Sequence, residues 1–194
     1  MKKILVLGAG LVAKPLVRYL LDQPEFQVTC ASRTVSKAEA LVDGHPRGVA
    51  KSVDLTDPKA IAGLVPSADL VISMVPYTFH VQVAEPCIAH KKPFVSTSYV
   101  SPAMRALDER AKAAGIMLLN EIGLDPGIDH MSAMRVFHDV KKRGGTIKSF
   151  MSYCGGLPAP EANTNPFGYK FSWSPRGVLL AGKNSAKYLK DGKV

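Results

Sequence analysis

Residues 3–13 read KILVLGAGLVA, a short apolar run that ends in a glycine-rich turn. A continuous apolar run of this length predicts a strand that is buried on both faces. The spacing of Gly8, Gly10 and Ala13 matches the turn that binds the pyrophosphate of a dinucleotide. Gly8 makes the tight turn, Gly10 lets the backbone approach the pyrophosphate, and Ala13 allows the next helix to pack closely. The alternative is a glycine-rich turn that binds no ligand.

Strands and helices alternate along the chain that follows this turn. We predict strands over 3–8, 27–32, 48–55, 69–75, 93–98 and 116–120. We predict helices over 11–21, 36–42, 57–65, 79–91 and 101–115, the fourth of them kinked or interrupted at Pro86. This alternation predicts an α/β Rossmann-type fold with a doubly wound parallel sheet.

The pattern changes after residue 125. Here we predict a helix over 128–144 and a strand over 146–154, followed by an irregular segment over 155–177 that is rich in Gly, Pro and Asn. The last stretch, 178–194, reads as a helix with no partner to pack on. We therefore predict a dinucleotide-binding domain over 1–125 and the beginning of a substrate-binding domain over 126–194, incomplete by residue 194.

Composition narrows the class of protein. The three cysteines are odd in number and widely spaced, which argues against a disulfide framework or a zinc ribbon and suits the reducing cytosol. No apolar run reaches the roughly 18 residues of a membrane-spanning helix. The net charge is +9, but the basic residues are scattered without interleaved aromatic residues, so we predict no nucleic-acid partner. Binding of phosphates or of a polycarboxylate substrate explains the charge as well, as does an acidic portion of a longer chain.

The residues at the end of the second predicted strand indicate whether the cofactor is NAD or NADP. NAD enzymes place an acidic residue there, whereas this chain has Ser32, Arg33 and Thr34. These side chains suit a 2′-phosphate, which predicts NADP(H); the alternative is an exposed loop arginine. Asp54, at the end of the third strand, either contacts the adenine ring or caps the helix that follows.

Ligands of open parallel sheets bind outside the carboxyl ends of the strands. Pro76 with Tyr77, Ser98 with Tyr99, and Asp125 end three successive strands and are expected to converge where the nicotinamide lies. The alternative is that they only form turns. Asp129 is expected to serve the start of the following helix, where a negative charge meets the positive end of the helix dipole.

The sequence near these strand ends suggests two further kinds of site, a nucleophile and a metal site. Cys154 is either a nucleophile without a neighbouring base or a small packing residue. Asp125, Asp129 and His130 do not have the spacing of a standard metal site, so we predict no metal.

Five segments carry a resemblance to a known family. They are LVISMVPYTFH (70–80), STSYVSPAMRAL (96–107), NEIGLDPGIDHM (120–131), SYCGGLPAPE (152–161) and YKFSWSPRGVLL (169–180). Together they resemble the saccharopine dehydrogenase (NADP, L-glutamate-forming) family. The resemblance implies an enzyme of lysine metabolism that interconverts saccharopine with 2-aminoadipate 6-semialdehyde and L-glutamate through an imine, with NADP(H) as cofactor.

The resemblance also implies the location, the partners and the length of the protein. We expect a cytoplasmic enzyme with no membrane partner, one that can form a homodimer and is roughly twice as long as this chain. Two alternatives remain: an imine-reducing enzyme of polyamine metabolism, or a non-catalytic NADP(H) sensor or scaffold.

The same resemblance assigns site residues. From the chemistry of the implied reaction we predict two catalytic residues: Asp125 holds the substrate amine and stabilises its cation, and Tyr99 relays a proton. On the cofactor side the resemblance places Gly8, Gly10, Val12, Arg33, Thr34, Asp54, Pro76 and Tyr77, and we predict that Leu11, Ser32 and Val75 lie beside them. Around the substrate the resemblance places Tyr99, Asp125, Cys154, Gly155, Leu157, Ser172 and Trp173. We add Ser98 from its position at a strand end, and Arg176 as a candidate partner for a substrate carboxylate.

Overall fold

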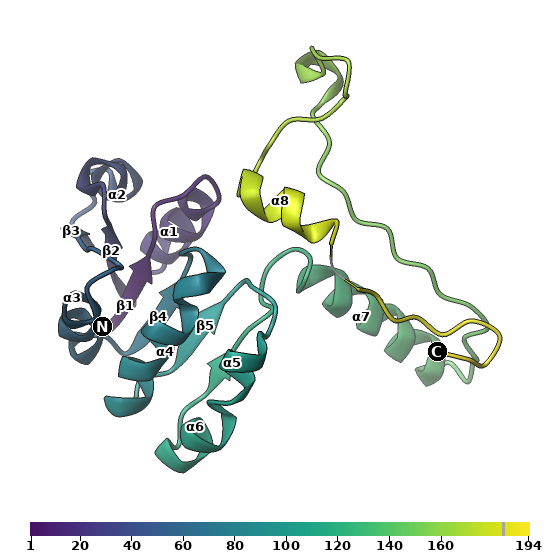
Figure 1. Ribbon diagram of the computed structural model, residues 1–194, viewed down its shortest axis with the longest axis horizontal. Helices are drawn as coiled ribbons and strands as arrows, with labels where there is room; N and C mark the ends of the chain where they lie inside the picture. The colour runs from purple at the N-terminus through teal and green to yellow at the C-terminus, as the bar shows by residue number, and fades with distance from the viewer. Residues whose placement is uncertain (184) are drawn as a thin grey trace. The chain divides into compact units, whose positions relative to one another are not determined.

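The computed structural model describes residues 1–183 and 185–194. It contains a six-stranded parallel sheet in the order β3-β2-β1-β4-β5-β6 (Figure 1). The strands are β1 (Lys2–Leu7), β2 (Phe26–Ser32), β3 (Gly48–Ser52), β4 (Leu70–Ser73), β5 (Phe94–Ser96) and β6 (Leu118–Leu119). The prediction of a doubly wound Rossmann-type sheet is therefore confirmed.

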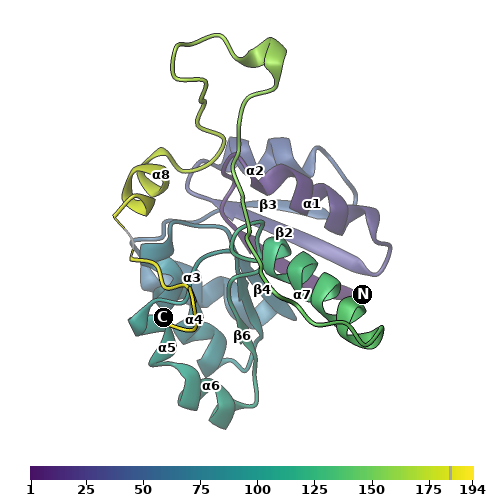
Figure 2. The same cartoon turned by 90° about the vertical axis from the view of Figure 1, so that its right-hand side faces the viewer.

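Helices cover both faces of this sheet (Figure 2). One face carries α1 (Ala13–Asp22) and α2 (Val35–Val42). The other face carries α3 (Pro58–Leu64), α4 (His80–Ala89), α5 (Pro102–Arg105) and α6 (Asp108–Ala114). The remaining helical elements are η1 (Val65–Ser67), η2 (Tyr77–Phe79), α7 (Ile128–Lys142), η3 (Pro160–Ala162) and α8 (Pro175–Ala181).

The continuous apolar run of β1 is explained by this two-sided cover. Ile4 and Val6 pack into the core beneath α1 and α2, whereas Leu5 and Leu7 pack into the core on the opposite face. Successive side chains of a strand point to opposite faces, so the part of β1 with helices on both sides, Ile4 to Leu7, is apolar at every position, whereas Lys2 and Lys3 before it are exposed.

The chain places β2 and β3 on one side of β1 and then returns to place β4, β5 and β6 on its other side. Strands β1 and β4 are paired, with Leu7 opposite Ser73. The backbone N–H of Met74 donates to the carbonyl of Leu7 at 2.8 Å, so the turns after β1 and β4 begin side by side. In open α/β sheets, ligands bind outside the carboxyl ends of the strands at such a switch point.

The helix predicted over 101–115 is divided into α5 and α6. Ser101 caps its start as a side-chain acceptor for the Met104 N–H, at 3.1 Å. Further along, the Leu107 N–H bonds to the carbonyl of Met104, three residues back, and the Leu107 side chain is buried. This tighter turn ends α5 because it points Leu107 into the core. In contrast, α4 is a single helix that runs on through Pro86.

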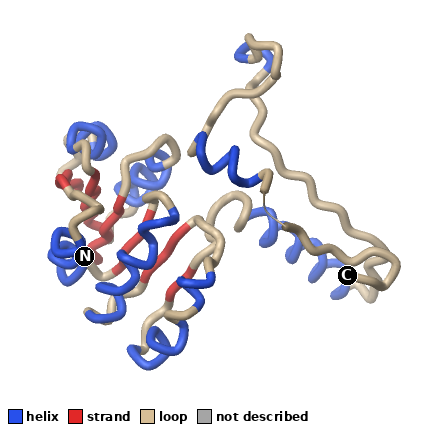
Figure 3. The backbone as a smooth tube through the Cα atoms, viewed as in Figure 1, coloured by secondary structure: helices blue, strands red, loops and turns tan. Residues whose placement is uncertain are grey.

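Two predictions for the later part of the chain are wrong (Figure 3). Residues 146–154 form no strand and are almost all exposed. An alternating sequence forms a strand only where another strand pairs with it, and no strand among the described residues pairs with this segment. Its exposed backbone groups can bond to water instead. The helix predicted over 178–194 is replaced by the shorter α8, which starts at Pro175 after the capping residue Ser174 and ends before Gly182. Residue 184 of that prediction lies outside the described residues.

The chain divides into two compact units, Met1–Cys154 and Gly155–Val194. The first unit includes α7 together with the whole sheet. The start of a substrate-binding domain after residue 125 stays a prediction. Within the described residues, no helix is both long enough and apolar enough to cross a membrane.

Candidate active site

The turn between β1 and α1 has the shape that its glycines predicted. Gly8 has φ +108°, and a Cβ at this position would lie 2.8 Å from the carbonyl oxygen of Met74, so only glycine fits. A Cβ at Gly10 would meet no atom within 4 Å. Ala13 is fully buried at the start of α1. The turn thus passes close to β4 and leaves open space beside Gly10.

The start of α1 is suited to an anion. Its N-cap residue, Val12, makes no side-chain capping bond. The Ala13 N–H donates to the carbonyl of Gly10 and Pro15 has no N–H, which leaves the Lys14 N–H in the first turn for another acceptor. Leu11 and Val12 are exposed on this turn. An open, glycine-lined turn at an uncapped helix start fits a dinucleotide pyrophosphate.

The end of β2 presents a cation to solvent. Ser32 is the last residue of the strand, and Arg33 and Thr34 after it are exposed. Across from them, the Asp54 carboxylate accepts hydrogen bonds from the Thr56 N–H at 2.9 Å and the Thr56 hydroxyl at 2.8 Å. These bonds, and to a lesser extent the charge of Arg33, lower the pKa of Asp54. Arg33 and Thr34 therefore remain open to a phosphate group.

The capping role considered for Asp54 is wrong. The N-cap of α3 is Asp57, whose carboxylate accepts the Lys59 N–H at 2.9 Å. Asp54 lies three residues before this N-cap, and its carboxylate accepts hydrogen bonds from Thr56 rather than from an N–H group of α3. Its contact with an adenine ring stays a prediction.

The end of β4 leads into a short exposed turn. Val75 is buried, while Pro76 and Tyr77 are exposed at the start of η2. Because β4 is paired with β1, this turn lies next to the glycine turn at Gly8. The structure thus brings together Val75, Pro76 and Tyr77 with the predicted pyrophosphate site.

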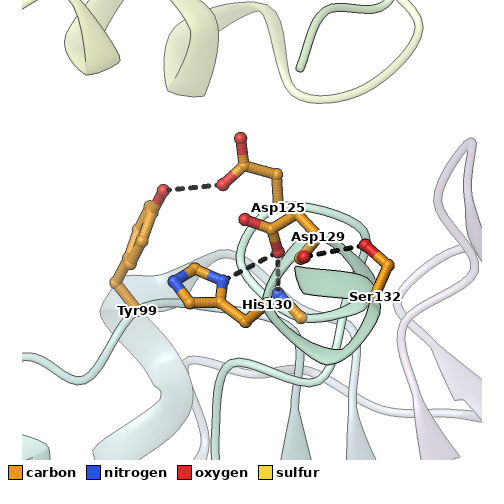
Figure 4. Close-up of polar contacts among 6 residues, drawn as sticks. Tyr99, Asp125, Asp129, His130 and Ser132 are labelled. Atoms are coloured by element: carbon orange, nitrogen blue, oxygen red, sulfur yellow. Dashed lines mark hydrogen bonds and ion pairs between the residues drawn. The ribbon is translucent and has the colours of Figure 1, made fainter. Parts of the chain in front are cut away.

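Tyr99 and Asp125 meet at the ends of β5 and β6 (Figure 4). The Tyr99 hydroxyl donates to Oδ1 of Asp125 at 3.4 Å. Burial raises the pKa of Tyr99, and the negative charge of Asp125 and the hydrogen bond to it raise the pKa further. The phenol therefore keeps its proton at neutral pH beside a carboxylate, which is an arrangement that can pass a proton.

Cys154 lies beside the same carboxylate. Partial desolvation raises the pKa of its thiol, and the charge of Asp125 with a hydrogen bond to it acts in the same direction. A thiol that is held protonated is a poor nucleophile. Cys154 is also exposed, so it is not a core packing residue either. Its geometry suits a wall of the site near Asp125.

The loop that presents Asp125 is built around Gly127. Gly127 has φ +149°, and a Cβ there would lie 2.1 Å from the carbonyl oxygen of Gly123. The Gly123 N–H donates to the carbonyl of Pro126, which follows Asp125 through a cis peptide bond. No side chain fits at position 127 without moving this backbone, so the loop that presents Asp125 requires glycine at this position.

Asp129 serves the start of α7, as predicted. Its Oδ1 accepts the Gly127 N–H and faces Nδ1 of His130, each at 2.8 Å (Figure 4). Burial alone would raise the pKa of Asp129, but the hydrogen bonds from His130 and Gly127 outweigh it and hold the pKa low. The same pairing raises the pKa of His130. Among the described residues, no cluster of three or more His, Cys, Asp or Glu side chains is arranged to hold a metal ion.

Two residues that sequence reasoning missed organise this edge of the sheet. His80 is buried between Ser73 and Ser98, and Glu121 bonds to the backbone of Val100. The bonding partners of His80 lie 7 and 18 residues away in sequence, and those of Glu121 lie more than 20 away. No local spacing could have indicated either role.

Four predicted substrate residues lie in the second compact unit: Gly155, Leu157, Ser172 and Trp173. Within that unit, a Cβ on Gly156 would lie 3.5 Å from the Ser172 hydroxyl oxygen, so the 155–157 turn is next to Ser172. The Trp173 ring packs over Gly177 in the first turn of α8. Leu157 is exposed. The role of these four residues stays a prediction.

A doubly wound sheet with a glycine turn at its switch point defines a dinucleotide-binding protein of the Rossmann class. Comparison with known families makes the assignment narrower. Residues 4–119 match the family described as "Saccharopine dehydrogenase NADP binding domain", and residues 123–194 match "Saccharopine dehydrogenase C-terminal domain". The chain belongs to the saccharopine dehydrogenase family, and the prediction of NADP(H) as the cofactor is confirmed.

Curated relatives agree over the whole chain. It is 52% identical over 194 residues to "Saccharopine dehydrogenase [NADP(+), L-glutamate-forming]" of Schizosaccharomyces pombe, covering 100% of this chain and 43% of the relative. It is 45% identical to the mitochondrial alpha-aminoadipic semialdehyde synthase of Bos taurus, covering 100% of this chain and 21% of that protein. The chain thus spans less than half the length of these relatives.

A solved structure also matches. The apo saccharopine dehydrogenase (L-Glu forming) of Saccharomyces cerevisiae superposes with a TM-score of 0.84 at 50% identity, covering 100% of this chain and 43% of that one. An Agrobacterium radiobacter oxidoreductase in complex with NAD+ reaches a TM-score of 0.56 at 17% identity, which shows only a shared fold.

Proposed function

We propose that this protein is an NADP(H)-dependent saccharopine dehydrogenase of the L-glutamate-forming type. The observation that carries the proposal is the pairing of Tyr99 with Asp125 at the strand ends of a dinucleotide-binding sheet. The 52% identity to a relative of that name supports the choice of substrate. The reaction interconverts saccharopine with 2-aminoadipate 6-semialdehyde and L-glutamate, in lysine metabolism.

The roles of the paired side chains follow from the chemistry of an imine. The amine of glutamate condenses with the aldehyde and releases water, and the resulting C=N bond takes a hydride on carbon and a proton on nitrogen. NADPH supplies the hydride. The Asp125 carboxylate stabilises the cationic nitrogen electrostatically, and the protonated Tyr99 hydroxyl relays a proton during condensation. Saccharopine oxidation uses the same groups in reverse.

The remaining predicted residues divide between the two ligands. Gly8, Gly10, Leu11 and Val12 would hold the pyrophosphate, Ser32, Arg33 and Thr34 would hold the 2′-phosphate, and Asp54 would contact the adenine ring. Val75, Pro76 and Tyr77 line the nicotinamide side. Ser98, Cys154, Gly155, Leu157, Ser172 and Trp173 line the substrate, and Arg176 pairs with one of its carboxylates.

The absorbance of reduced nicotinamide tests the activity directly. We expect reduction of NADP with saccharopine, and much less with NAD or when lysine replaces saccharopine. Asp125→Asn and Tyr99→Phe should each lower kcat by about a hundredfold, the usual size for a lost acid–base group. Binding of NADP without any turnover of saccharopine would favour a sensor or scaffold, and turnover with a polyamine-derived imine would favour the polyamine alternative.

Arg33→Ala tests the cofactor separately. A lost charge-assisted hydrogen bond is worth about 1.5–3 kcal/mol, so we expect NADPH binding to weaken by about tenfold or more. NADH binding should change little, because NADH has no 2′-phosphate. Arg105→Ala, an exposed arginine of α5, is the control. Equal losses for both cofactors would contradict the role of Arg33.

The location and assembly of the protein stay predictions. A cytoplasmic enzyme suits the three free cysteines, although the name of the bovine relative places that protein in mitochondria. A homodimer is the predicted assembly, and sedimentation of the purified protein would test it.

A further inference from the structure

His80 is a buried histidine with both ring nitrogens bonded. It is the first residue of α4 and is 4% exposed. Its Nδ1 lies 2.9 Å from the hydroxyl of Ser73, the last residue of β4. Its Nε2 lies 2.8 Å from the hydroxyl of Ser98, just beyond β5. The imidazole therefore bridges the ends of two neighbouring strands.

The bridge carries no charge. Burial lowers the pKa of His80 to about 4, so the ring is neutral at physiological pH. A neutral imidazole has one N–H donor and one acceptor, and serine hydroxyls can complement either. The edge of the ring also packs against Phe94, with the centroids 6.0 Å apart. Both nitrogens are thus satisfied inside the protein, which leaves the ring a single orientation.

Residues 98–100, which include the His80 partner Ser98, also form hydrogen bonds with Glu121. The Glu121 N–H donates to the carbonyl of Ser98 at 3.1 Å, and the Val100 N–H donates to the Glu121 carboxylate at 3.1 Å. Glu121 has a positive φ of 63°, which turns its backbone toward this segment. Three hydrogen bonds therefore fix the residues on either side of Tyr99.

Tyr99 depends on this backbone for its position. Its side chain is 60% exposed, so core packing does not hold the ring. Its hydroxyl nevertheless lies 3.4 Å from Asp125, a residue 26 positions away on another loop. A small shift of residues 98–100 would separate the phenol from the carboxylate.

We propose that His80 is a positioning residue for Tyr99, which it holds toward Asp125 through its hydrogen bond to Ser98. The imidazole does not touch the reacting atoms. It fixes the end of β5 relative to the end of β4 and so sets the direction of the Tyr99 ring. The catalytic consequence rests on the proposed function, whereas the positioning itself does not.

A spectroscopic experiment tests the positioning without turnover. The full chain would be labelled at the ring carbon that bears the hydroxyl in its six tyrosines, and Tyr99→Phe identifies the Tyr99 resonance by NMR. In His80→Gln and in Ser98→Ala, we expect the Tyr99 resonance to move and the pKa of Tyr99 to fall toward its ordinary value. The reason is that the phenol loses its contact with Asp125.

The matched control is Ser96→Ala. Ser96 is a buried serine of the same strand region, but its hydroxyl donates to Asn120 Oδ1 at 2.9 Å rather than to His80. This variant should leave the Tyr99 resonance unchanged. An unchanged resonance and titration of Tyr99 in both His80→Gln and Ser98→Ala would overturn the proposal. Ser98→Ala removes a single hydroxyl group, so it keeps the test available if His80→Gln folds poorly.

Turnover kinetics then measure the catalytic consequence. We expect His80→Gln to lower kcat for saccharopine oxidation about tenfold and to leave the KM for NADP unchanged. In a Tyr99→Phe background the same change should cost less than about twofold, because the group that His80 positions is already absent. Equal fold losses in both backgrounds would show that His80 acts independently of Tyr99. Absence of turnover in the unaltered chain would count against the proposed function, and the NMR result would still decide the positioning.

Discussion

Residues 4–111 contain all the buried hydrophobic side chains of the described core, whereas α7 and α8 have no buried residue. Apolar side chains are not scarce in the later part. Met131, Met134, Phe167 and Leu179 are all exposed there. The difference therefore does not come from a lack of hydrophobic residues.

The two regions also differ in how the apolar residues are arranged along the chain. In the first region, short apolar strands alternate with helices, and each new strand pairs with one already present, so both faces of the sheet are covered. In the second, glycine, proline and asparagine interrupt the chain, and no strand within the described residues adds to the sheet. Burial requires a second layer, and among the described residues the helices on both faces of the sheet supply one for the first region.

The largest expected effect compares one phenylalanine from each region. Phe94 is fully buried in β5, whereas Phe167 is 89% exposed. Phe94→Ala should lower the free energy of unfolding by about 3–5 kcal/mol, because it leaves a cavity in the core. Phe167→Ala should change it by less than about 0.5 kcal/mol. Urea unfolding followed by circular dichroism measures both, and similar losses would contradict the contrast between the regions.

The second effect is a dependence of stability on pH that comes from His80. Its pKa is about 4 in the folded protein against an ordinary 6.5, so between these values the unfolded chain binds a proton that the folded protein does not. Its contribution to the free energy of unfolding is therefore complete above pH 6.5 and decreases as the pH falls toward 4. The loss is about 3 kcal/mol, since one pKa unit corresponds to about 1.4 kcal/mol.

Unfolding measured at neutral pH and near pH 5 tests this dependence. His80→Gln should be less sensitive to acid over this range than the unaltered chain. His138→Gln, at an exposed position of α7, is the matched control and should keep the full sensitivity. If His80→Gln and the unaltered chain lose stability in parallel, the assignment to His80 is wrong.

The third effect lies at the junction of the regions. Gly127→Ala places a Cβ 2.1 Å from the Gly123 carbonyl oxygen, so the loop that presents Asp125 must move. We expect a loss of about 2 kcal/mol in stability, in the range for a strained backbone position, together with loss of the Tyr99–Asp125 contact. Thermal unfolding and the Tyr99 NMR resonance report the two results.

The control for that change is Gly63→Ala. Gly63 lies in α3, where a Cβ would meet no atom within 4 Å. Alanine is the better helix former, so this variant should be unchanged or more stable by up to about 1 kcal/mol. A Gly127→Ala protein as stable as the control would mean that the loop has a second low-energy form.

The smallest effect compares two helix caps. Asp57 caps α3 in the first region by accepting the Lys59 N–H, and Ser174 caps α8 in the second by accepting the Gly177 N–H. Asp57→Ala should cost about 1 kcal/mol of global stability, the usual value of a cap. Ser174→Ala should leave the main unfolding transition unchanged, because no residue of α8 is buried. A shift of the main transition by Ser174→Ala would show that α8 is part of the cooperative core.

Sequence reasoning succeeded for features that depend on neighbours in the chain. The order of strands and helices, the glycine turn at Gly8 and the capping serine Ser101 are all set by local spacing and by residue type. It failed where tertiary contacts or solvent decide the conformation. Leu107 divides a helix because its side chain enters the core, and residues 146–154 alternate in sequence without a strand to pair with.

The candidate site shows the same division. Tyr99 and Asp125 could be proposed from the sequence because each follows a predicted strand, and the carboxyl ends of parallel strands share one edge of the sheet. That their side chains meet at 3.4 Å depended on the packing of two loops. His80 and Glu121 could not be proposed, because they act on partners distant in sequence. The sequence by itself determined the sheet and the edge on which the site lies, because the periodicity of strands and helices is a local property. Only the tertiary structure decided which side chains meet at that edge, because hydrogen bonds between loops join residues that are distant in the sequence.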